Sequence, residues 1–421
     1  MARQSQKGLV RAREVGGHFE IIISILCQLF ESYDKSCEIM PDASQDGKYM
    51  AMSYRSLVTG GCGFIGRHLV EALRDRGDMV RVFDLRPWTE SSNAKAPVGI
   101  DVMQGSVTDA AMVRRAMDGI DRVFHLAADP NLWAAQPGHF HAVNYLGTCR
   151  MLEESARHPI RRFVYTSTES ILKSANGDRT SSRALIDESV RLRIDDMPGP
   201  YCRSKFLAEE AAHHAAAGGM PLVIVNPTMP LGPGDFLLTP PTKMALGFIN
   251  GTTPAYLDCE FNIVDVRDVA FGHVLAAEKG RIGERYILGN ENLRLGEMLN
   301  EIARLTGLRM PRCKIPYGLA YVSALISEGI AKISKQPPIA PLTGVRLARS
   351  SMAFDCSKAR RELGWQVRPL RQTLYDTLIW LRDTGLLKRG IKLPSTVDIL
   401  PDTQRARARV DKNLPIGSLA D

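Results

Sequence analysis

The chain has 421 residues, of which 44% are hydrophobic and 24% charged, so it can bury one large α/β domain with a smaller lobe. Its net charge of +8 comes from dispersed Lys and Arg residues interrupted by acids, without the aromatic-rich basic runs that nucleic-acid-binding proteins use. The eight cysteines form no CxxC pair and no His-Cys cluster with zinc spacing, so we expect reduced thiols, no metal site and no nucleic-acid partner.

The first 52 residues differ in pattern from the rest of the chain. Their one apolar run, residues 21–30, is far shorter than the ~20 residues of a membrane-spanning helix. Acidic residues abut it on both sides, and no small-residue cleavage site comes after it. We therefore expect residues 1–52 to be a disordered extension, with Met50 or Met52 as an alternative start, and the protein to be cytoplasmic with no transmembrane segment.

From residue 54 onward, short apolar strands alternate with helices. A strand from Tyr54 enters a glycine-rich turn, and a helix follows with Ile65, Leu69, Val70 and Leu73 at helical spacing. Further strands are predicted at 79–84, 102–105, 122–128, 162–167 and 222–226, and further helices at 140–156 and 201–217. This alternation predicts an α/β fold with a doubly wound parallel sheet, the Rossmann arrangement, over residues 54–230.

Beyond residue 230 the alternation loosens into Pro- and Gly-rich loops and short helices. We expect residues 231–387 to form mostly a smaller C-terminal α/β lobe that binds the substrate, with some elements returning to the first sheet. Helical segments at 359–365 and 370–381 close the folded part. Residues 388–421 are polar and proline-punctuated, so we expect a loosely ordered tail.

One segment of this lobe, residues 315–333, admits two interpretations. It carries apolar residues at helical spacing: Leu319, Val322, Leu325, Ile326, Ile330 and Ile333. The spacing fits a helix that faces the core, and it also fits an amphipathic helix that lies on a membrane. Because Glu328 and two lysines do not make a strongly basic face, we expect the core-facing helix, with peripheral membrane contact as the alternative.

The glycine-rich turn has the spacing of a dinucleotide site. Gly60, Gly63 and Gly66 recur at three-residue steps between strand and helix, which leaves the helix N-terminus open to a pyrophosphate. Asp84 ends the second strand, where a carboxylate accepts hydrogen bonds from ribose hydroxyls and repels a 2′-phosphate. The order strand, turn, helix, strand and acid predicts NAD as the cofactor, with NADP less favoured despite Arg86.

A candidate catalytic pair opens the helix at 201–217. Tyr201 and Lys205 stand at positions i and i+4 and share one helical face. A nearby ammonium favours a phenolate, so we expect Lys205 to lower the pKa of Tyr201 and make it a general acid/base. The strand before this helix ends in hydroxyl-bearing residues, including Ser167 and Thr168, which would face the same ligand.

With these motifs in place, residues 54–385 resemble the extended short-chain dehydrogenase/reductases, which include nucleotide-sugar epimerases, dihydroflavonol reductases and 3β-hydroxysteroid dehydrogenases. Further landmarks are His125-Leu-Ala-Ala128, Asn226-Pro227, the segment 262–268 and the closing segment 357–365. Residues 226–235, 248–251, 254–256 and 280–289 look most like the hopanoid-associated sugar epimerases, which are close to dihydroflavonol reductases.

The resemblance implies a role for each matching residue. Thr168, Tyr201 and Lys205 match the catalytic set, and Lys205 would also hold the nicotinamide ribose. The residues that would contact or support the cofactor are Gly60, Gly63, Phe64, Ile65, Gly66, Asp84, Leu126, Ala127, Ala128, Asn144, Ser167, Asn226, Pro227 and Thr228. The resemblance also implies a small-molecule substrate and a homodimer.

Two positions depart from the family's pattern. Ser106 stands where an acid usually holds the adenine, so that contact would fall to the backbone or the Ser106 hydroxyl. Glu169-Ser170 replaces the Asp-Glu pair that comes after the catalytic Thr in sugar dehydratases, which argues against water elimination.

Three functions remain open from the sequence. The favoured one is an NAD-dependent sugar epimerase acting on a nucleotide-linked or hopanoid-linked sugar. The second is a dehydrogenase or reductase acting on a steroid-like, triterpenoid or flavonoid-like alcohol. The third is a non-catalytic NAD-binding regulator, which need not keep an intact Thr-Tyr-Lys set.

Overall fold

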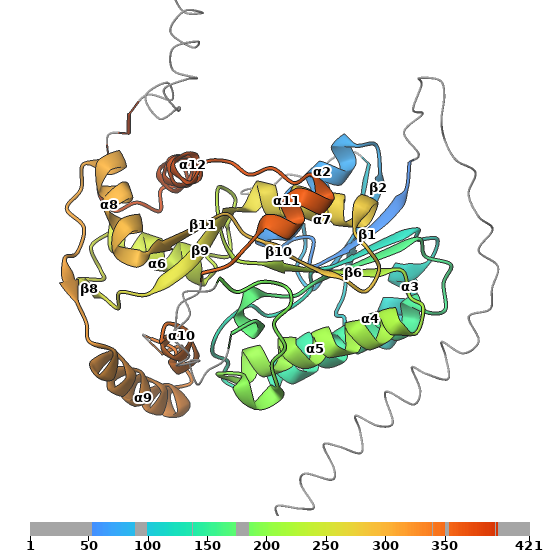
Figure 1. Cartoon of the computed structure of the whole chain (residues 1–421), viewed down its shortest axis with the longest axis horizontal. Helices are drawn as coiled ribbons and strands as arrows, with labels where there is room; N and C mark the ends of the chain where they lie inside the picture. Colours follow the sequence, from blue (N-terminus) through green and yellow to red (C-terminus); the bar gives the residue numbers. More distant parts are fainter. Residues whose placement is uncertain are drawn as a thin grey trace, which may run out of the picture.

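The computed structural model describes residues 53–394 apart from 89–98, 137, 174–184, 339, 350–352 and 392. Within them lies a sheet of seven parallel strands in the order β10, β6, β5, β4, β1, β2, β3 (Figure 1). These strands are β1 (Arg55–Thr59), β2 (Met79–Asp84), β3 (Ile100–Gln104), β4 (Arg122–His125), β5 (Arg162–Thr166), β6 (Leu222–Pro227) and β10 (Arg285–Leu288). The predicted doubly wound parallel sheet is confirmed.

Helices cover both faces of this sheet (Figure 1). On one face lie α2 (Phe64–Asp75), α7 (Val266–Lys279) and α11 (Ser357–Leu363), and on the other α3 (Ala110–Met117), α4 (Gly147–Ser155) and α5 (Pro200–Ala217). Successive strand residues alternate between the two faces, so that Leu57 packs in one core and Val58 in the other. Both residues are fully buried, as expected for a sheet covered on both sides.

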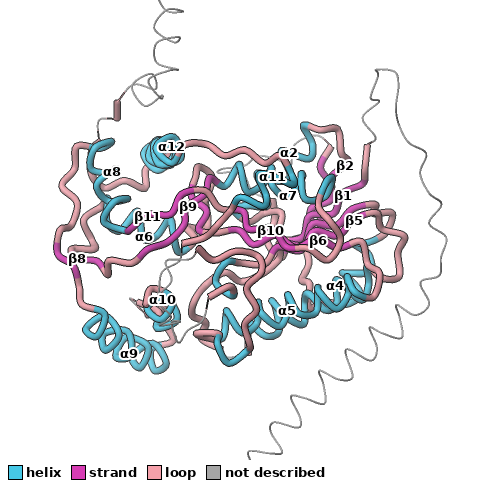
Figure 2. The backbone as a smooth tube through the Cα atoms, viewed as in Figure 1, coloured by secondary structure: helices cyan, strands magenta, loops and turns pink. Residues whose placement is uncertain are grey.

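A second, smaller group of elements lies at the other end of the molecule. Its sheet has β9 (Glu260–Asp265) between β7 (Met229–Leu231) and β11 (Glu291–Arg294). Its helices are α6 (Pro240–Ile249), α8 (Leu295–Thr306) and α12 (Leu370–Asp383), which share one apolar core with the sheet. A two-stranded pair, β8 (Ala255–Tyr256) with β12 (Cys313–Lys314), lies at its outer edge (Figure 2).

The observed elements differ from the predicted ones at several points. The strand predicted to reach residue 128 ends at His125, because the next backbone N–H groups turn to Thr59. The helix predicted at 140–156 begins with a π-helical turn, η1 (His141–Leu146). Helix α3 was not predicted, although the Asp109 carboxylate accepts hydrogen bonds from the N–H groups of Ala111 and Met112, which is an N-cap that the sequence displays.

The core-facing interpretation of residues 315–333 is wrong. They form α9 (Tyr317–Ser334), which contacts α10 (Leu342–Leu347) at the edge of the molecule (Figure 1). Only Ala324 and Ala331 of this helix are buried. The six large apolar side chains that suggested a core are 46–87% exposed, because small residues and two tyrosines make the contact instead.

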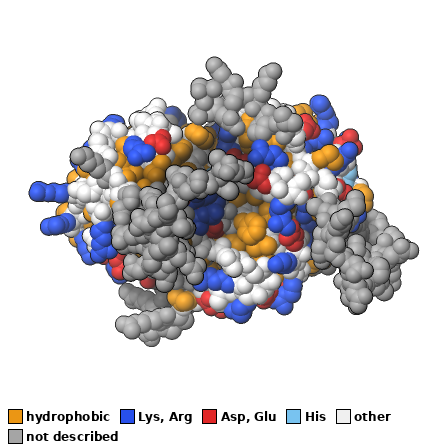
Figure 3. Space-filling model, turned by 90° about the horizontal axis from the view of Figure 1, so that it is seen from above, with side chains coloured by type: hydrophobic (Ala, Val, Ile, Leu, Met, Phe, Trp, Pro, Cys, Tyr) orange, Lys and Arg blue, Asp and Glu red, His pale blue; other side chains and the backbone are white. Residues whose placement is uncertain are grey.

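Several sequence-based expectations concern residues that the structure covers only in part. Residues 1–52 and the tail after residue 394 lie outside the described part of the chain. In the described part, no helix combines the length and hydrophobicity that crossing a bilayer requires. Of the six cysteines described there, all are free thiols and four are buried. On the face in Figure 3, Lys and Arg side chains are interspersed with Asp and Glu.

A buried ion pair ties the last strand of the large sheet to α5. The guanidinium group of Arg285 lies 2.9 Å from the Glu209 carboxylate, and it also donates to the Glu188 backbone oxygen. Burial by itself would raise the pKa of Glu209, but a hydrogen bond with His213 and the charge of Arg285 hold that pKa well below its usual range. We predict that Arg285→Ala lowers the free energy of unfolding by about 3 kcal/mol, because it strips a buried carboxylate of its cation.

Thermal or urea denaturation measures this change. The matched control is Arg304→Ala, which removes a guanidinium group from a side chain that is 74% exposed and paired with Glu301. The control should cost less than ~0.5 kcal/mol. Equal losses of unfolding free energy in the two variants would show that the buried ion pair stabilises the fold no more than the exposed one does.

Candidate active site

The turn between β1 and α2 brings backbone against backbone. Gly60 has φ +71°, and a Cβ at this position would lie 2.8 Å from the Ala127 backbone nitrogen. A Cβ on Gly66 would lie 2.2 Å from the Gly60 carbonyl oxygen. A side chain at either position would therefore force the helix off the turn. A Cβ on Gly63, the N-cap of α2, would meet only the Gly60 oxygen, at 3.1 Å, which leaves open the approach to the helix N-terminus.

Asp84 is fixed against this turn by backbone hydrogen bonds. Its two carboxylate oxygens accept from the N–H groups of Cys62 and Arg86, each at 2.9 Å. The carboxylate thus stands beside the glycine turn at the end of β2, with lone pairs left for hydroxyl donors. Ile65 packs against the core and anchors α2, whereas Phe64, although buried, lines a pocket beside the turn.

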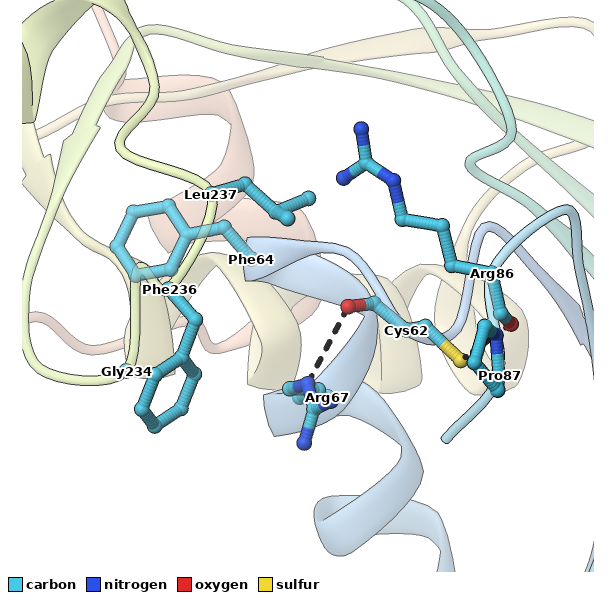
Figure 4. A pocket seen from close by; sticks show the side chains of 8 residues that line it. All are labelled: Cys62, Phe64, Arg67, Arg86, Pro87, Gly234, Phe236 and Leu237. Carbon is cyan, nitrogen blue, oxygen red and sulfur yellow. Dashed lines mark hydrogen bonds between the residues drawn. The ribbon is translucent and has the colours of Figure 1, made fainter. Parts of the chain in front are cut away.

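A pocket of about 180 Å³ adjoins the same turn. In Figure 4 the Arg67 side chain is directed at the Cys62 backbone, whereas the Arg86 side chain lies on the other side of Cys62 and extends away from it. The Arg67 Nε atom donates to the Cys62 carbonyl oxygen at 3.2 Å. The lining residues are Cys62, Phe64, Arg67, Arg86, Pro87, Gly234, Phe236 and Leu237. Two guanidinium groups beside a helix N-terminus form an electropositive setting that suits a phosphate group.

The strands on the far side of β1 contribute the next candidates. Leu126, Ala127 and Ala128 follow β4 and are half-buried at the sheet edge. The Ala127 N–H donates to the Thr59 hydroxyl at 3.2 Å, which holds this segment beside the glycine turn. His125, which precedes it, bridges the hydroxyls of Thr59 and Thr148, and burial lowers its pKa to about 3, so its ring is neutral.

Asn144 lies in the π-helical turn and is fully buried. Its Oδ1 accepts from the Asp129 N–H at 2.8 Å, and its Nδ2 donates to the Ser204 hydroxyl at 3.1 Å. The side chain thus connects the segment after β4 to the helix that carries Tyr201 and Lys205. Wider π-helical turns occur often at functional sites, because the extra residue re-aims one side chain.

Tyr201 and Lys205 lie on one face of the first turns of α5, which begins at Pro200 after its N-cap Gly199. The Lys205 Nζ atom donates to the Thr166 carbonyl oxygen at 2.7 Å and lies 4.6 Å from the centre of the Tyr165 ring. Burial lowers the pKa of Lys205 to about 7. The structure therefore fixes Lys205 between α5 and β5.

The pKa of Tyr201 departs from the sequence-based expectation. Burial raises it, the Glu169 charge raises it further, and a hydrogen bond with Thr168 lowers it only in part. The expectation that Lys205 would bring this pKa toward neutrality is wrong for this arrangement. The physical reason is that Lys205 is itself desolvated and directed to the Thr166 carbonyl, so burial outweighs its charge.

Thr168 and Glu169 follow the end of β5 side by side. The Thr168 hydroxyl donates to the Glu169 carboxylate at 2.9 Å and accepts from the Ser170 N–H at 3.2 Å. Burial raises the pKa of Glu169, against the lowering effect of those hydroxyls. Sequence reasoning used Glu169 only to argue against a dehydratase. Its position next to the candidate catalytic hydroxyl was the signal that could have placed it in the site.

The end of β6 completes the edge. Asn226 is fully buried, and its Nδ2 donates to the Thr168 carbonyl oxygen at 3.2 Å and to Glu209 at 2.8 Å. The Thr228 hydroxyl, beyond Pro227, donates to the Asn262 side-chain oxygen at 2.8 Å. Ser167 is buried, and its N–H donates to the Val225 oxygen of β6. These side chains pack inward and hold the backbone on which Thr168 stands.

Ser106 lies apart from this hydroxyl-rich edge. Its hydroxyl accepts from the Thr108 N–H at 3.1 Å and lies 2.8 Å from the Thr108 hydroxyl, so it is engaged in a local turn after β3.

In the described residues, no group of three or more His, Cys, Asp or Glu side chains is arranged to hold a metal ion. The candidates therefore gather at the carboxyl ends of β1, β2, β4, β5 and β6, which is where open α/β sheets bind ligands.

Known proteins resemble this chain in sequence over most of its length. A putative dihydroflavonol 4-reductase of Synechocystis is 35% identical over 81% of this chain and 98% of its own. Sterol demethylase protein B of Methylococcus capsulatus is 30% identical over 79% of this chain and 99% of its own.

Solved structures show the same architecture. The crystal structure of gox2253 matches with a TM-score of 0.69 and 32% identity over 80% of this chain and 100% of that one. A nucleoside-diphosphate-sugar epimerase from Pseudomonas aeruginosa, with a TM-score of 0.64 and 23% identity over 80% of this chain and 99% of its own, shares the fold.

The family model that describes the NAD-dependent epimerase/dehydratase family matches residues 56–289, which span the glycine turn, the Thr168–Tyr201–Lys205 group and every strand of the large sheet. This chain is therefore a member of the NAD-dependent epimerase/dehydratase family and an NAD(P)-dependent enzyme.

Proposed function

We propose that this enzyme is an NAD-dependent dehydrogenase or reductase that interconverts a secondary alcohol and a ketone on a polycyclic, lipophilic substrate. The observation that carries the proposal is the setting of Tyr201: a buried phenol, hydrogen-bonded to Thr168 and bordered by an apolar cluster. The relatives named as a dihydroflavonol reductase and a sterol demethylase protein support a polycyclic ligand.

The apolar cluster around Tyr201 draws on several segments. The Phe140 ring meets the Tyr201 ring edge-on at 6.1 Å. The other buried members are Ile171, Leu172, Met197, Cys202, Ile287, Leu347, Phe354 and Cys356. A hydrocarbon ring system gains from such surroundings, whereas the hydroxyls of a sugar need polar partners.

A nucleotide-sugar epimerase, favoured by the sequence motifs, is the second candidate and is supported by the family as a whole. It must bind a diphosphate in the smaller lobe. Two arginines at the border of that lobe, on α7 and β11, are already paired with carboxylates: Arg267 lies 2.7 Å from Asp265 and 2.6 Å from Asp376, and Arg294 lies 3.2 Å from Asp258. This pairing favours the dehydrogenase.

The residues present fit a bound NAD. The open side of Gly63 and the N-terminus of α2 suit the pyrophosphate, and Asp84 suits the adenosine ribose. Leu126, Ala127, Ala128, Asn226, Pro227 and Thr228 would border or support the nicotinamide half. Bound NAD supplies the hydride acceptor for alcohol oxidation, and NADH the donor for the reverse reaction.

The chain's own residues would then transfer the proton of the substrate hydroxyl. Thr168 and Tyr201 would hydrogen-bond the reacting oxygen, and Tyr201 would take the hydroxyl proton as the carbon loses its hydride. Lys205, held by the Thr166 carbonyl, would hold the nicotinamide ribose. The buried setting excludes water, which strengthens each of these interactions.

The experiment offers the purified enzyme NAD with a panel of sterols, triterpenols and nucleotide sugars, and follows NADH absorbance. We expect NADH to accumulate with a polycyclic alcohol. In Tyr201→Phe, which keeps the ring and loses the titrating oxygen, turnover should fall by ~10²- to 10⁴-fold while NAD binding persists. Thr168→Ser, which keeps the hydroxyl, is the mild control.

Conversion of a nucleotide sugar to its epimer with no net NADH would overturn the dehydrogenase in favour of the epimerase. Full turnover by Tyr201→Phe would overturn the assignment of Tyr201 as the acid/base.

Cofactor choice gives a second prediction. The Asp84 carboxylate should repel the 2′-phosphate of NADP, so NAD should bind more tightly, although Arg86 lines the adjoining pocket. Asp84→Ala should narrow the gap between the two dissociation constants, measured by fluorescence titration. Asp75→Ala, which removes a carboxylate that is 69% exposed at the far end of α2, is the control and should leave both dissociation constants nearly unchanged. Tighter NADP binding by the unmodified enzyme would contradict the prediction.

The Glu169 carboxylate gives a third prediction. Because its negative charge raises the pKa of Tyr201, Glu169→Gln should lower that pKa and shift the pH profile of kcat/KM for alcohol oxidation to lower pH. Glu210→Gln removes the same charge from a half-buried position on α5 and is the matched control. Superimposable profiles for the Glu169 variant and the unmodified enzyme would show that the two groups are not coupled.

A further inference from the structure

Helix α9 turns an apolar face away from the protein. Its exposed large side chains are Leu319 (62%), Val322 (52%), Leu325 (46%), Ile326 (61%), Ile330 (61%) and Ile333 (87%). Among the exposed residues of this helix, Lys332 alone is charged. A solvent-facing helix ordinarily presents polar and charged side chains on that side, so this face is built to be covered.

The polar groups of α9 are directed elsewhere. Its one acid, Glu328, accepts a hydrogen bond from the Leu342 N–H at 2.8 Å and so holds the start of α10. The Tyr317 and Tyr321 rings stack on each other at 6.0 Å and belong to the small cluster between α9 and α10. The side of the helix that meets the protein is thus fully used, and the other side carries the apolar stripe.

The charge around the stripe identifies what would cover it. Between residues 307 and 349 the chain has seven basic residues, Arg309, Arg312, Lys314, Lys332, Lys335, Arg346 and Arg349, against the single acid Glu328. One of them, Lys314, is paired with Asp258 at 2.8 Å, which leaves an excess of cations. All of the basic residues except Arg346 are exposed. An apolar helix face flanked by cations at both ends is complementary to the surface of an anionic bilayer, where hydrocarbon lies just beneath negative headgroups.

A second copy of the chain fits this face less well. The helix has 18 residues and is therefore roughly 27 Å long, and one face of it is about 10 Å wide. That is roughly 270 Å², well below the ~800 Å² that each partner of a stable dimer buries. In a symmetric dimer formed through this face, the cationic flanks of the two copies would also lie close together, and their repulsion would oppose the dimer further. A homodimer formed through another surface is compatible with an uncovered α9.

We propose that α9 docks this enzyme on anionic membranes, lying in the interface with Leu319, Ile326 and Ile330 inserted among the lipid chains. It lies on the surface and does not span the bilayer, because the helices described are too short or too polar for that.

Docking there would place the candidate active site next to the bilayer. Helix α10 lies between α9 and the site: its Leu347 carbonyl accepts a hydrogen bond from Lys173, and Leu347 is part of the apolar cluster around Tyr201. The Thr343 side chain packs against Gly199, two residues before Tyr201. A lipophilic substrate would then pass from the bilayer along α10, a consequence that rests on the proposed function.

Co-sedimentation of the full chain with vesicles tests the docking. The vesicles contain either phosphatidylcholine alone or equal amounts of phosphatidylcholine and phosphatidylglycerol. We expect binding to the mixed vesicles, weaker binding to the neutral ones, and weakening by salt. The variant Leu319→Gln/Ile326→Gln/Ile330→Gln should lose roughly tenfold or more in affinity. All three side chains are exposed, so folding should be unaffected.

The matched control changes three exposed apolar residues outside α9, Met79→Gln/Phe271→Gln/Ile282→Gln, and should bind vesicles as the unmodified chain does. Absence of binding by the full chain, or equal binding by the α9 variant, overturns the proposal. So does an α9 variant that only converts a dimer to a monomer, since the face would then belong to a second copy. Vesicle binding without turnover of any polycyclic alcohol would leave the docking intact and contradict the proposed function.

Discussion

The arrangement of the candidate site depends on the close backbone approach at the end of β1. The Gly60 carbonyl oxygen lies where a Cβ on Gly66 would have to be, so α2 leaves the sheet at the shortest distance that two backbones allow. β1 stands between β2 and β4, and the chain builds outward from it in both directions. The carboxyl end of β1 is therefore the switch point of the sheet, where the crossover helices diverge and leave a crevice. Asp84, Ala127 and the N-terminus of α2 are all placed by hydrogen bonds or contacts with this one turn.

Burial sets the electrostatics of the other half of the site. Tyr201, Lys205 and Glu169 all lose water, which raises the pKa values of Tyr201 and Glu169 and lowers that of Lys205, so each is driven toward its neutral form. Such a site holds little net charge until a ligand brings its own. The hydrogen bonds that orient these groups run to the backbone of β5, to Ser170 and to one another, so their positions depend on the sheet.

The smaller lobe and the α9–α10 pair add a second chemical character. The apolar cluster around Tyr201 includes Leu347 of α10, and α10 packs against α9, a helix whose outer face is also apolar. A site enclosed by hydrocarbon and adjoining an exposed apolar helix suits a ligand that is more soluble in lipid than in water. The proposed reaction and the proposed membrane docking therefore have a common physical basis, although each stands on its own observations.

The candidate residues of the site could be proposed from the sequence because their signals are local. The spacing of Gly60, Gly63 and Gly66, the acid at the end of β2 and the Tyr201–Lys205 pair at i and i+4 reflect turns and helices that neighbouring residues define. The parallel sheet was predicted from the alternation of strands and helices, which is also a local pattern. The structure confirms that sheet. The N-cap of α3 at Asp109 is an equally local signal, from which the start of this helix could have been predicted.

The remaining features were decided by tertiary packing. The direction of the Tyr201 pKa depends on burial and on Glu169, which folding brings into the same buried space, and no spacing rule encodes desolvation. Helix α9 shows most directly what sequence patterns leave undetermined. Apolar residues at helical spacing predict that a helix has an apolar face, but they do not indicate which part of the protein or its surroundings that face contacts. The sequence by itself determined that α9 is amphipathic and where the glycine-rich turn lies. Only the tertiary structure decided that the stripe on α9 points outward, because α10 is packed by alanines and tyrosines from its opposite side.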